Sequence, residues 1–175
     1  MSELKIGQVQ VYTGDGKGKT TAALGLALRA AGAGLRVLFG QFCKGRDVAE
    51  HAGLARLGDR VTARHTGSCS FITGAPTAAD VAAAQAMLAE LRTALQSGAY
   101  DVVVADELNV ALDLNLVALA QVHDLLDARP PQVELVLTGR HAPPEIIARA
   151  DLVTEMLALK HPYDEGLEAR RGIEY

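Results

Sequence analysis

Cysteine is scarce in this sequence, tryptophan is absent, and no apolar run is long enough to cross a membrane. The two cysteines, Cys43 and Cys69, can form neither a disulfide framework nor the spacing of a zinc site. A membrane-spanning helix needs about 18 or more consecutive apolar residues, and no run approaches that length. The first ten residues, MSELKIGQVQ, also lack the basic and apolar stretches of a signal peptide. We therefore expect a cytoplasmic protein in a reducing compartment, with no membrane partner.

Basic residues are fewer than acidic ones, with 17 Lys and Arg against 21 Asp and Glu, and the formal net charge is −4 at pH 7. Nonspecific binding to nucleic acid depends on Lys and Arg that neutralise phosphates, so this balance argues against a nucleic-acid partner. Hydrophobic residues make up 49% of the sequence and charged residues 22%, which excludes a disordered chain. No internal repeat, low-complexity segment or linker divides the sequence. We expect residues 1–175 to form a single domain with its own core.

Short apolar runs alternate with helix-like stretches along the sequence. This alternation predicts a three-layer α/β fold with a mostly parallel sheet of five or six strands. The predicted strands cover residues 8–13, 36–42, 61–65, 101–107, 133–139 and 152–159. The predicted helices cover residues 20–31, 48–57, 77–97 (beginning at a Thr77–Asp80 capping box) and 116–129, with a short helix that begins at residue 143. Ligands of such folds bind beyond the carboxyl ends of the strands, where we expect the functional residues.

A glycine-rich segment, TGDGKGKTT at residues 13–21, follows the first predicted strand and begins the first predicted helix. It matches the phosphate-binding loop (P-loop) pattern of glycine, four residues and Gly-Lys-Ser/Thr, except that Thr13 replaces the opening glycine. Its three glycines let successive backbone N–H groups surround an anion at a helix N-terminus. We expect Lys19 to bind phosphate oxygens, Thr20 to bind Mg²⁺ and Thr21 to donate to a phosphate. The alternative is a turn that only caps a helix, and Lys17 either binds phosphate or faces water.

Two carboxylates, Asp106 and Glu107, end the most apolar predicted strand. A P-loop enzyme needs an acidic partner for its metal ion, and such a group belongs at a strand end. Because successive strand residues point to opposite faces, one carboxylate is expected to reach Mg²⁺ and the other a neighbouring loop, and the sequence does not choose between them. Glu107 could also position water or act as a base, which leaves ATP hydrolysis open. From the residues alone, the prediction is a protein that binds Mg-ATP.

The P-loop and several further segments, taken together, resemble the ATP:corrinoid adenosyltransferases of the cobalamin-biosynthesis type. These segments lie in order along nearly the whole chain: TGDGKGKTTAALG, QFCKG, DELN, LTGR, PPE, DLVTEM, KHP and GIEY. The resemblance implies a RecA-like P-loop fold and a homodimer. It implies transfer of the 5′-deoxyadenosyl group of ATP to the Co(I) centre of a reduced corrinoid, with release of triphosphate, in adenosylcobalamin biosynthesis or salvage. It also implies Mg²⁺ as cofactor and an external reductase or flavoprotein as electron donor.

The residue patterns and the resemblance together assign roles to individual positions. Catalytic roles are expected for Lys19, Thr20 and Glu107, and a metal site for Thr20, Asp106 and Glu107. The residues expected to contact ATP are Thr13, Gly14, Asp15, Gly16, Lys17, Gly18, Lys19, Thr20, Thr21 and Arg140. The residues expected on the corrinoid side are Gln41, Lys44, Phe71 and Thr73.

One segment departs from the family pattern, which often has Phe-Thr-Trp before the long helix, a stretch thought to exclude the lower axial ligand of cobalt. The matching stretch here is Phe71-Ile72-Thr73, and the chain has no tryptophan. Phe71 either supplies an apolar face to the corrinoid or packs in the core, and Arg140 either binds phosphate or forms a salt bridge. Two other functions are alternatives: a P-loop ATPase or phosphotransferase, and a noncatalytic protein that binds ATP or adenosyl-corrinoid.

Overall fold

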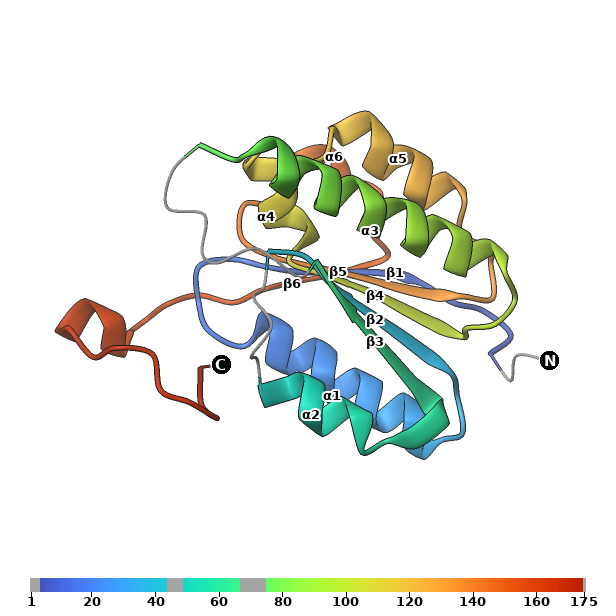
Figure 1. Ribbon diagram of the computed structural model, residues 1–175, viewed down its shortest axis with the longest axis horizontal. Coiled ribbons are helices and arrows are strands. Elements are labelled where there is room, and N and C mark those ends of the chain that lie inside the picture. Colours follow the sequence, from blue (N-terminus) through green and yellow to red (C-terminus); the bar gives the residue numbers. More distant parts are fainter. Residues whose placement is uncertain (1–3, 44–48, 67–74, 175) are drawn as a thin grey trace.

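Six parallel strands form a twisted sheet through the middle of the molecule (Figure 1). The computed structural model describes residues 4–43, 49–66 and 75–174. The strands lie in the order β3-β2-β4-β5-β1-β6, and every pair of neighbours is parallel. Their bounds are Val9–Thr13 (β1), Val37–Gln41 (β2), Val61–His65 (β3), Val102–Asp106 (β4), Glu134–Thr138 (β5) and Leu152–Glu155 (β6). The predicted α/β fold with a parallel sheet of five or six strands is thus confirmed.

Helices cover both faces of the sheet, so that the molecule has three layers (Figure 1). Helices α1 and α2 pack on one face, whereas α3, α4, α5 and α6 pack on the other. Their bounds are Lys19–Gly32 (α1), Ala49–Ala55 (α2), Ala78–Gln96 (α3), Leu108–Asp113 (α4), Leu119–Asp127 (α5) and Pro144–Ile147 (α6), with 3-10 helices at Gly58–Arg60 and Pro162–Glu165. Within the described part of the chain, none of these helices is long and apolar enough to span a membrane.

Alternate residues of each inner strand pack into two apolar clusters, one against each helix layer. In β4, Val103 and Ala105 belong to the cluster that includes α3 and α5, whereas Val102 and Val104 belong to the cluster that includes α1 and α2. Side chains alternate in this way because a strand has a period of two, and burial on both faces is typical of parallel strands between helices. Asp106 continues the row of Val102 and Val104, which directs its carboxylate toward the α1 face.

The carboxyl ends of the parallel strands share one edge of the sheet, and this edge brings the predicted functional segments together. The P-loop follows β1, and Glu107 follows β4. In the sheet, β5 lies between β1 and β4. The P-loop backbone and the acidic end of β4 are therefore two strands apart, and the first turn of α1 reaches across the end of β5 to bridge them.

The longest helix, α3, begins at the capping box that the sequence predicts. Thr77 Oγ1 accepts a hydrogen bond from the backbone N–H of Asp80 at 3.2 Å. In return, Asp80 Oδ2 accepts a hydrogen bond from the backbone N–H of Thr77 at 2.9 Å. Each bond satisfies an N–H group that has no acceptor within the helix, which fixes the point where the helix starts.

Some element boundaries differ from the prediction. The helix predicted over residues 116–129 is present as the shorter α5, and a helix that was not predicted, α4, starts directly after Glu107. Asn115 separates them in a left-handed conformation (φ +56°), and the Leu116 N–H returns to the Ala111 carbonyl at 2.8 Å. Strand β6 also ends at Glu155 rather than at residue 159, and a 3-10 helix follows it at Pro162–Glu165.

Candidate active site

The P-loop leaves β1 through a tight turn that its glycines make possible. Gly14 and Gly18 have positive φ angles of +91° and +126°, a region that other residues seldom adopt. A Cβ atom on Gly14 would lie 2.5 Å from the carbonyl oxygen of Met156. Thr13, which stands at the position of the usual first glycine, is buried, and its Oγ1 accepts a hydrogen bond from the Ala142 N–H at 3.2 Å. The threonine therefore ties the P-loop to the segment after β5.

The segment after β6 holds the P-loop from the other side. The Met156 N–H donates to the Thr13 carbonyl at 2.9 Å, and the Gly16 N–H donates to the Met156 carbonyl at 2.7 Å. A Cβ atom on Gly16 would lie 2.7 Å from that same carbonyl oxygen. Backbone contact at this distance requires glycine at position 16. Met156 was not among the predicted site residues, although a glycine at position 16 is a usable signal of a close backbone approach.

Lys19 lies at the centre of the loop with its side chain buried. Its Nζ donates hydrogen bonds to the carbonyl oxygens of Gly14 and Gly16, each at 2.7 Å. Burial lowers the pKa of Lys19 below the usual lysine value, while the negative charge of Glu107 raises it in part. A cation held in this way can exchange its bonds to carbonyls for bonds to anionic oxygens, which accept charge-assisted hydrogen bonds.

The carboxylate of Asp106 lies directly beside the first turn of α1. The Thr20 hydroxyl donates to Asp106 Oδ2 at 3.2 Å, and the Thr138 hydroxyl donates to Oδ1 at 2.6 Å. Asp106 and Thr138 are both fully buried. The structure thus brings together the two features that the sequence identified separately, the Lys-Thr end of the P-loop and the acidic end of β4. Thr138 was not among the predicted residues, although a polar side chain at the end of a buried strand is a usable signal.

Glu107 follows Asp106 directly, but it lies outside β4, at a point where the backbone turns. Its backbone is left-handed (φ +60°), and its N–H donates to the Thr138 hydroxyl oxygen at 2.9 Å. The side chain is partly buried and acts on the pKa of Lys19 through its charge. Both predicted carboxylates therefore lie near the loop, Asp106 against Thr20 and Glu107 within electrostatic reach of Lys19.

The donor atoms at this point suit a small hard cation. Thr20 and Asp106 offer a hydroxyl and a carboxylate, which are ligands that Mg²⁺ accepts. Over residues 4–43, 49–66 and 75–174, no group of three or more His, Cys, Asp or Glu side chains gathers to hold a metal ion. Mg²⁺ commonly binds one or two protein ligands together with substrate phosphates and water, so the residues present fit this ion better than zinc or calcium.

The remaining predicted ATP contacts form a more exposed rim. Arg140, which follows β5, has its Nε 3.8 Å from Asp15 Oδ1 of the P-loop. The exposed Lys17 donates instead to the C-terminal segment, to the Ile173 carbonyl at 2.8 Å and to Glu174 Oε1 at 3.0 Å. Thr21, two residues after Lys19, is exposed. Opposite charges thus link the loop to two other segments of the chain at this rim.

The residues predicted for the corrinoid side divide into two groups. Lys44, Phe71 and Thr73 lie outside the described residues, so their predicted roles stay predictions. Gln41, at the end of β2, has a fully buried side chain whose Nε2 donates to Asp106 Oδ2 at 2.8 Å. Gln41 therefore belongs to the surroundings of the Asp106 carboxylate.

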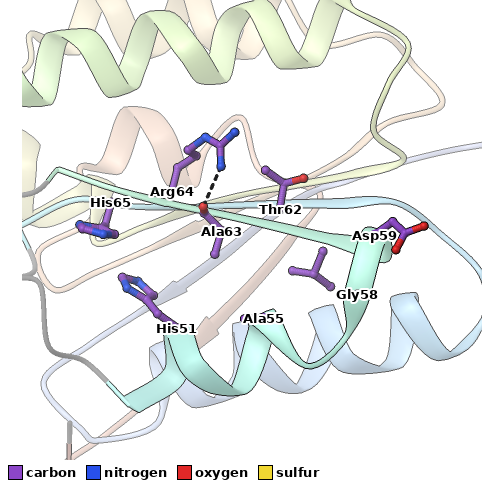
Figure 2. Close-up of a pocket in the computed structure, with 9 residues that line it drawn as sticks. His51, Ala55, Gly58, Asp59, Thr62, Ala63, Arg64 and His65 are labelled. Atoms are coloured by element: carbon purple, nitrogen blue, oxygen red, sulfur yellow. Dashed lines mark hydrogen bonds between the residues drawn. The ribbon is translucent and has the colours of Figure 1, made fainter.

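An open pocket of about 540 Å³ lies between α2 and the edge strand β3 (Figure 2). Figure 2 shows His51 of α2 directed toward His65 of β3, and their rings stack with centroids 4.6 Å apart. The residues that line the pocket are His51, Ala55, Gly58, Asp59, Val61, Thr62, Ala63, Arg64 and His65. None of them belongs to the P-loop or to the end of β4, so this pocket lies beside the candidate active site rather than within it.

Comparison with known proteins gives consistent matches over nearly the whole chain. Residues 5–175 match the family described as ATP:corrinoid adenosyltransferase BtuR/CobO/CobP. A corrinoid adenosyltransferase of Pseudomonas aeruginosa is 35% identical over 170 residues, which cover 97% of this chain and 84% of the relative. The corrinoid adenosyltransferase CobA of Salmonella typhimurium is 36% identical over 170 residues, with 97% and 86% covered. An uncharacterized protein of Nostoc sp. is 39% identical over 178 residues, which cover 92% of this chain and 46% of that relative.

Proposed function

The chain belongs to the ATP:corrinoid adenosyltransferase family. On that basis we propose how its P-loop and the acidic end of β4 promote transfer of the adenosyl group of ATP to a corrinoid. A member of this family is a transferase, and its reaction serves cobalamin synthesis or salvage. One observation carries the assignment of residues: the Thr20 hydroxyl of the P-loop lies 3.2 Å from Oδ2 of the buried Asp106. This contact joins a phosphate-binding loop to an acidic strand end at a single point.

The P-loop binds the triphosphate of ATP, which is the leaving group of the reaction. The N-terminus of α1 presents backbone N–H groups and partial positive charge to the anion. Lys19 exchanges its bonds to the Gly14 and Gly16 carbonyls for bonds to phosphate oxygens. Glu107 favours the charged form of Lys19, which opposes the effect of burial. These groups stabilise the negative charge that grows on the leaving triphosphate, and such stabilisation lowers the barrier.

Thr20 and Asp106 would hold Mg²⁺ at this site, with Glu107 beside them. When bound, the ion neutralises part of the negative charge on the phosphate oxygens. Asp106 is suited to this work because its two carboxylate oxygens are fixed by Thr20 and Thr138. A carboxylate that is already oriented loses little freedom when substrate arrives.

The nucleophile of the proposed reaction is the Co(I) centre of the reduced corrinoid, which is a substrate. The electron pair of Co(I) forms the bond to C5′ of ATP, the bond between C5′ and its phosphate oxygen breaks, and the triphosphate leaves with that bond's electrons. Co(I) has no proton to lose, so the protein needs no general base for the attack. Its work is to orient C5′ toward the corrinoid and to stabilise the leaving group.

The corrinoid side and the partners of the enzyme are further parts of the proposal. Lys44, Phe71 and Thr73 contact the corrinoid, as the resemblance to the family implies. Co(I) must be generated from a more oxidised corrinoid, so an external reductase or flavoprotein supplies the electrons. The family resemblance also supports a homodimer.

The products of the reaction test the proposal. The protein is incubated with Mg-ATP and chemically reduced cobalamin, and the phosphate product and the cobalt species are identified. We expect intact triphosphate and a light-sensitive cobalt–carbon bond in equal amounts. An Asp106→Asn variant should release triphosphate more slowly, whereas Asp59→Asn, at an exposed position far from the P-loop, should match the unmodified protein. ADP and phosphate as products would contradict the proposal and indicate a hydrolase or phosphotransferase.

A further inference from the structure

Gln41 occupies an unusual place for an uncharged side chain, between two carboxylates. It ends β2 and is fully buried. Its Nε2 donates to Asp106 Oδ2 at 2.8 Å and to Glu50 Oε1 at 3.1 Å. Its Oε1 lies 2.8 Å from Nε2 of His51. All three partners are side chains, one from β4 and two from α2.

These contacts fix the orientation of the amide and the proton on the imidazole. Ionised carboxylates only accept hydrogen bonds, so Glu50 and Asp106 take both N–H groups of Gln41. The amide carbonyl only accepts, so the His51 nitrogen that faces it carries a proton. A chain of directed hydrogen bonds therefore runs from His51 through Gln41 to Asp106.

The sheet register explains why this chain ends at the acidic site. Gln41 and Asp106 are paired residues of the neighbouring parallel strands β2 and β4, so their side chains emerge on the same face. Oδ2 of Asp106 accepts from both Gln41 and the Thr20 hydroxyl, while Oδ1 accepts from Thr138. Gln41 thus shares with Thr20 the oxygen that faces the P-loop.

We propose that Gln41 is a positioning residue that sets the rotation of the Asp106 carboxylate, and that His51 holds the Gln41 amide in place. This inference rests on the proposed function, because it takes Asp106 to act on Mg²⁺ bound with the triphosphate. In this role the fully buried Gln41 acts through its hydrogen bond to Asp106. Buried hydrogen-bond partners of this kind fix a ligand's orientation, and their loss commonly weakens metal affinity or activity about 10- to 100-fold.

The stacked histidines extend the same line of contacts to the edge of the sheet. The ring of His51 lies against that of His65 at the end of β3, with an angle of 22° between the ring planes (Figure 2). His65 is the registered neighbour of Gln41 on the other side of β2. The ring of His65 restricts the ring of His51, which restricts the amide. The position of Asp106 is therefore coupled to α2, the first described helix after the QFCKG segment.

Substitution of Gln41 by methionine tests the proposal, because methionine has a similar length and no hydrogen-bonding amide. Two quantities are measured for the full chain: the Mg²⁺ concentration that gives half-maximal triphosphate release, and the binding of Mn²⁺ to the protein–ATP complex by electron paramagnetic resonance. We expect Gln41→Met to raise the half-maximal Mg²⁺ concentration and to weaken Mn²⁺ binding, each about 10-fold or more. ATP binding measured with chelator present should change less than about twofold, since the Gln41 side chain is fully buried and the proposed role runs through the metal ion.

Gln85→Met is the matched control, because it removes a second hydrogen-bonded glutamine side chain, this one partly buried. Gln85 Nε2 donates to the Leu116 carbonyl at 2.9 Å and to Gln121 Oε1 at 3.0 Å, away from the P-loop. This variant should lose thermal stability without a change in metal dependence. His51→Ala should reproduce part of the Gln41→Met effect. His51→Gln keeps an N–H donor and should bind metal as the unmodified protein does.

Three results would overturn the proposal. One is a Gln41→Met variant that melts earlier, as Gln85→Met does, but binds Mn²⁺ as the unmodified protein does. Another, which decides the matter if Gln41→Met does not fold, is equal metal binding by His51→Ala, His51→Gln and the unmodified protein. The third is unmodified protein whose triphosphate release needs no divalent cation, which would refute the assignment of Asp106 to Mg²⁺ and not the adenosyl transfer itself.

Discussion

Lys19 shows at the scale of a single residue how burial and function oppose each other. The ammonium group is buried and bonded to two loop carbonyls. Replacement by methionine keeps much of the side-chain volume but removes the charge. A hydrogen bond to a charged group contributes about 1.5–3 kcal/mol, so Lys19→Met should weaken Mg-ATP binding roughly 10- to 100-fold. Calorimetric titration measures this change, with Lys5→Met at an exposed position as the control. Equal affinity of both variants would contradict the role of Lys19 in phosphate binding.

The pKa of Lys19 adds a pH dependence whose sign follows from burial. Burial lowers the pKa of this lysine in the empty site, so its proton is lost at a lower pH than from an exposed lysine. Between the folded and unfolded pKa values the unfolded chain binds more protons, so the free energy of unfolding rises with pH there. ATP binding favours the charged form and must therefore take up protons in the same range.

We expect the affinity advantage of unmodified protein over Lys19→Met to shrink as the pH rises toward 10. The decline should begin below about 10.4, the ordinary pKa of lysine. Calorimetry in two buffers of different ionisation enthalpy should show proton uptake by the unmodified protein alone. An advantage that stays constant up to pH 10 would show that the lysine keeps its proton, contrary to the effect of burial.

At the scale of the elements, the sequence predicted most of the strands and helices that carry the candidate site. Buried strands and helix starts have strong local signals, as the apolar run before Asp106 and the Thr77–Asp80 pair illustrate. Helix α4 was not predicted, because it has only six residues, too few for a helical period to be recognised, and it follows the left-handed Glu107 directly. The predicted extent of β6 was too long because residues 156–159 are hydrophobic as well, although the strand pairs only as far as Glu155.

The capping box of α3 gives a prediction at this scale. Thr77→Ala removes the side-chain acceptor for the Asp80 N–H and should lower the free energy of unfolding by about 1 kcal/mol. For a chain of this length that corresponds to a fall of roughly 2–4 °C in the melting temperature. Thr93→Ala, on the exposed surface of the same helix, should change stability by less than about 0.5 kcal/mol. Thermal unfolding measures both, and equal effects would show that the cap does not stabilise α3.

At the scale of the whole molecule, the site depends on contacts between segments far apart in the sequence. The P-loop is held by Met156 after β6, and the C-terminal segment returns to Lys17. Sequence reasoning identified the P-loop and the acidic strand end because each has a local pattern. It could not identify Met156, because the contact is made by backbone atoms, which are the same in every residue. The glycines at positions 14 and 16 were predicted only to let the loop surround an anion, and the structure shows that they also leave room for the Met156 backbone.

Glu174 links the C-terminal segment to the P-loop through an ion pair with Lys17. Its carboxylate accepts from the Arg170 side chain at 3.0 Å and from the Arg170 N–H at 2.7 Å, and it pairs with Lys17 of the P-loop at 3.0 Å. Hydrogen bonds from Arg170, and then from Lys17, lower the pKa of Glu174 to about 2. Because the folded value is depressed, the contribution of this contact is present above the ordinary glutamate pKa and is lost as the pH falls through about 2.

The carboxyl carbon-13 shift of Glu174 should therefore stay constant between pH 6 and pH 3.5 in the unmodified protein. In an Arg170→Met variant, which lacks the strongest partner, the same signal should titrate closer to the ordinary value of about 4.3. Lys17→Met should move the midpoint in the same direction by a smaller amount, since Lys17 contributes less than Arg170. A midpoint near 4.3 in the unmodified protein would mean that the C-terminal segment does not form its ion pair with the P-loop in solution. The Lys17 ammonium would then be available to the triphosphate without first breaking an ion pair.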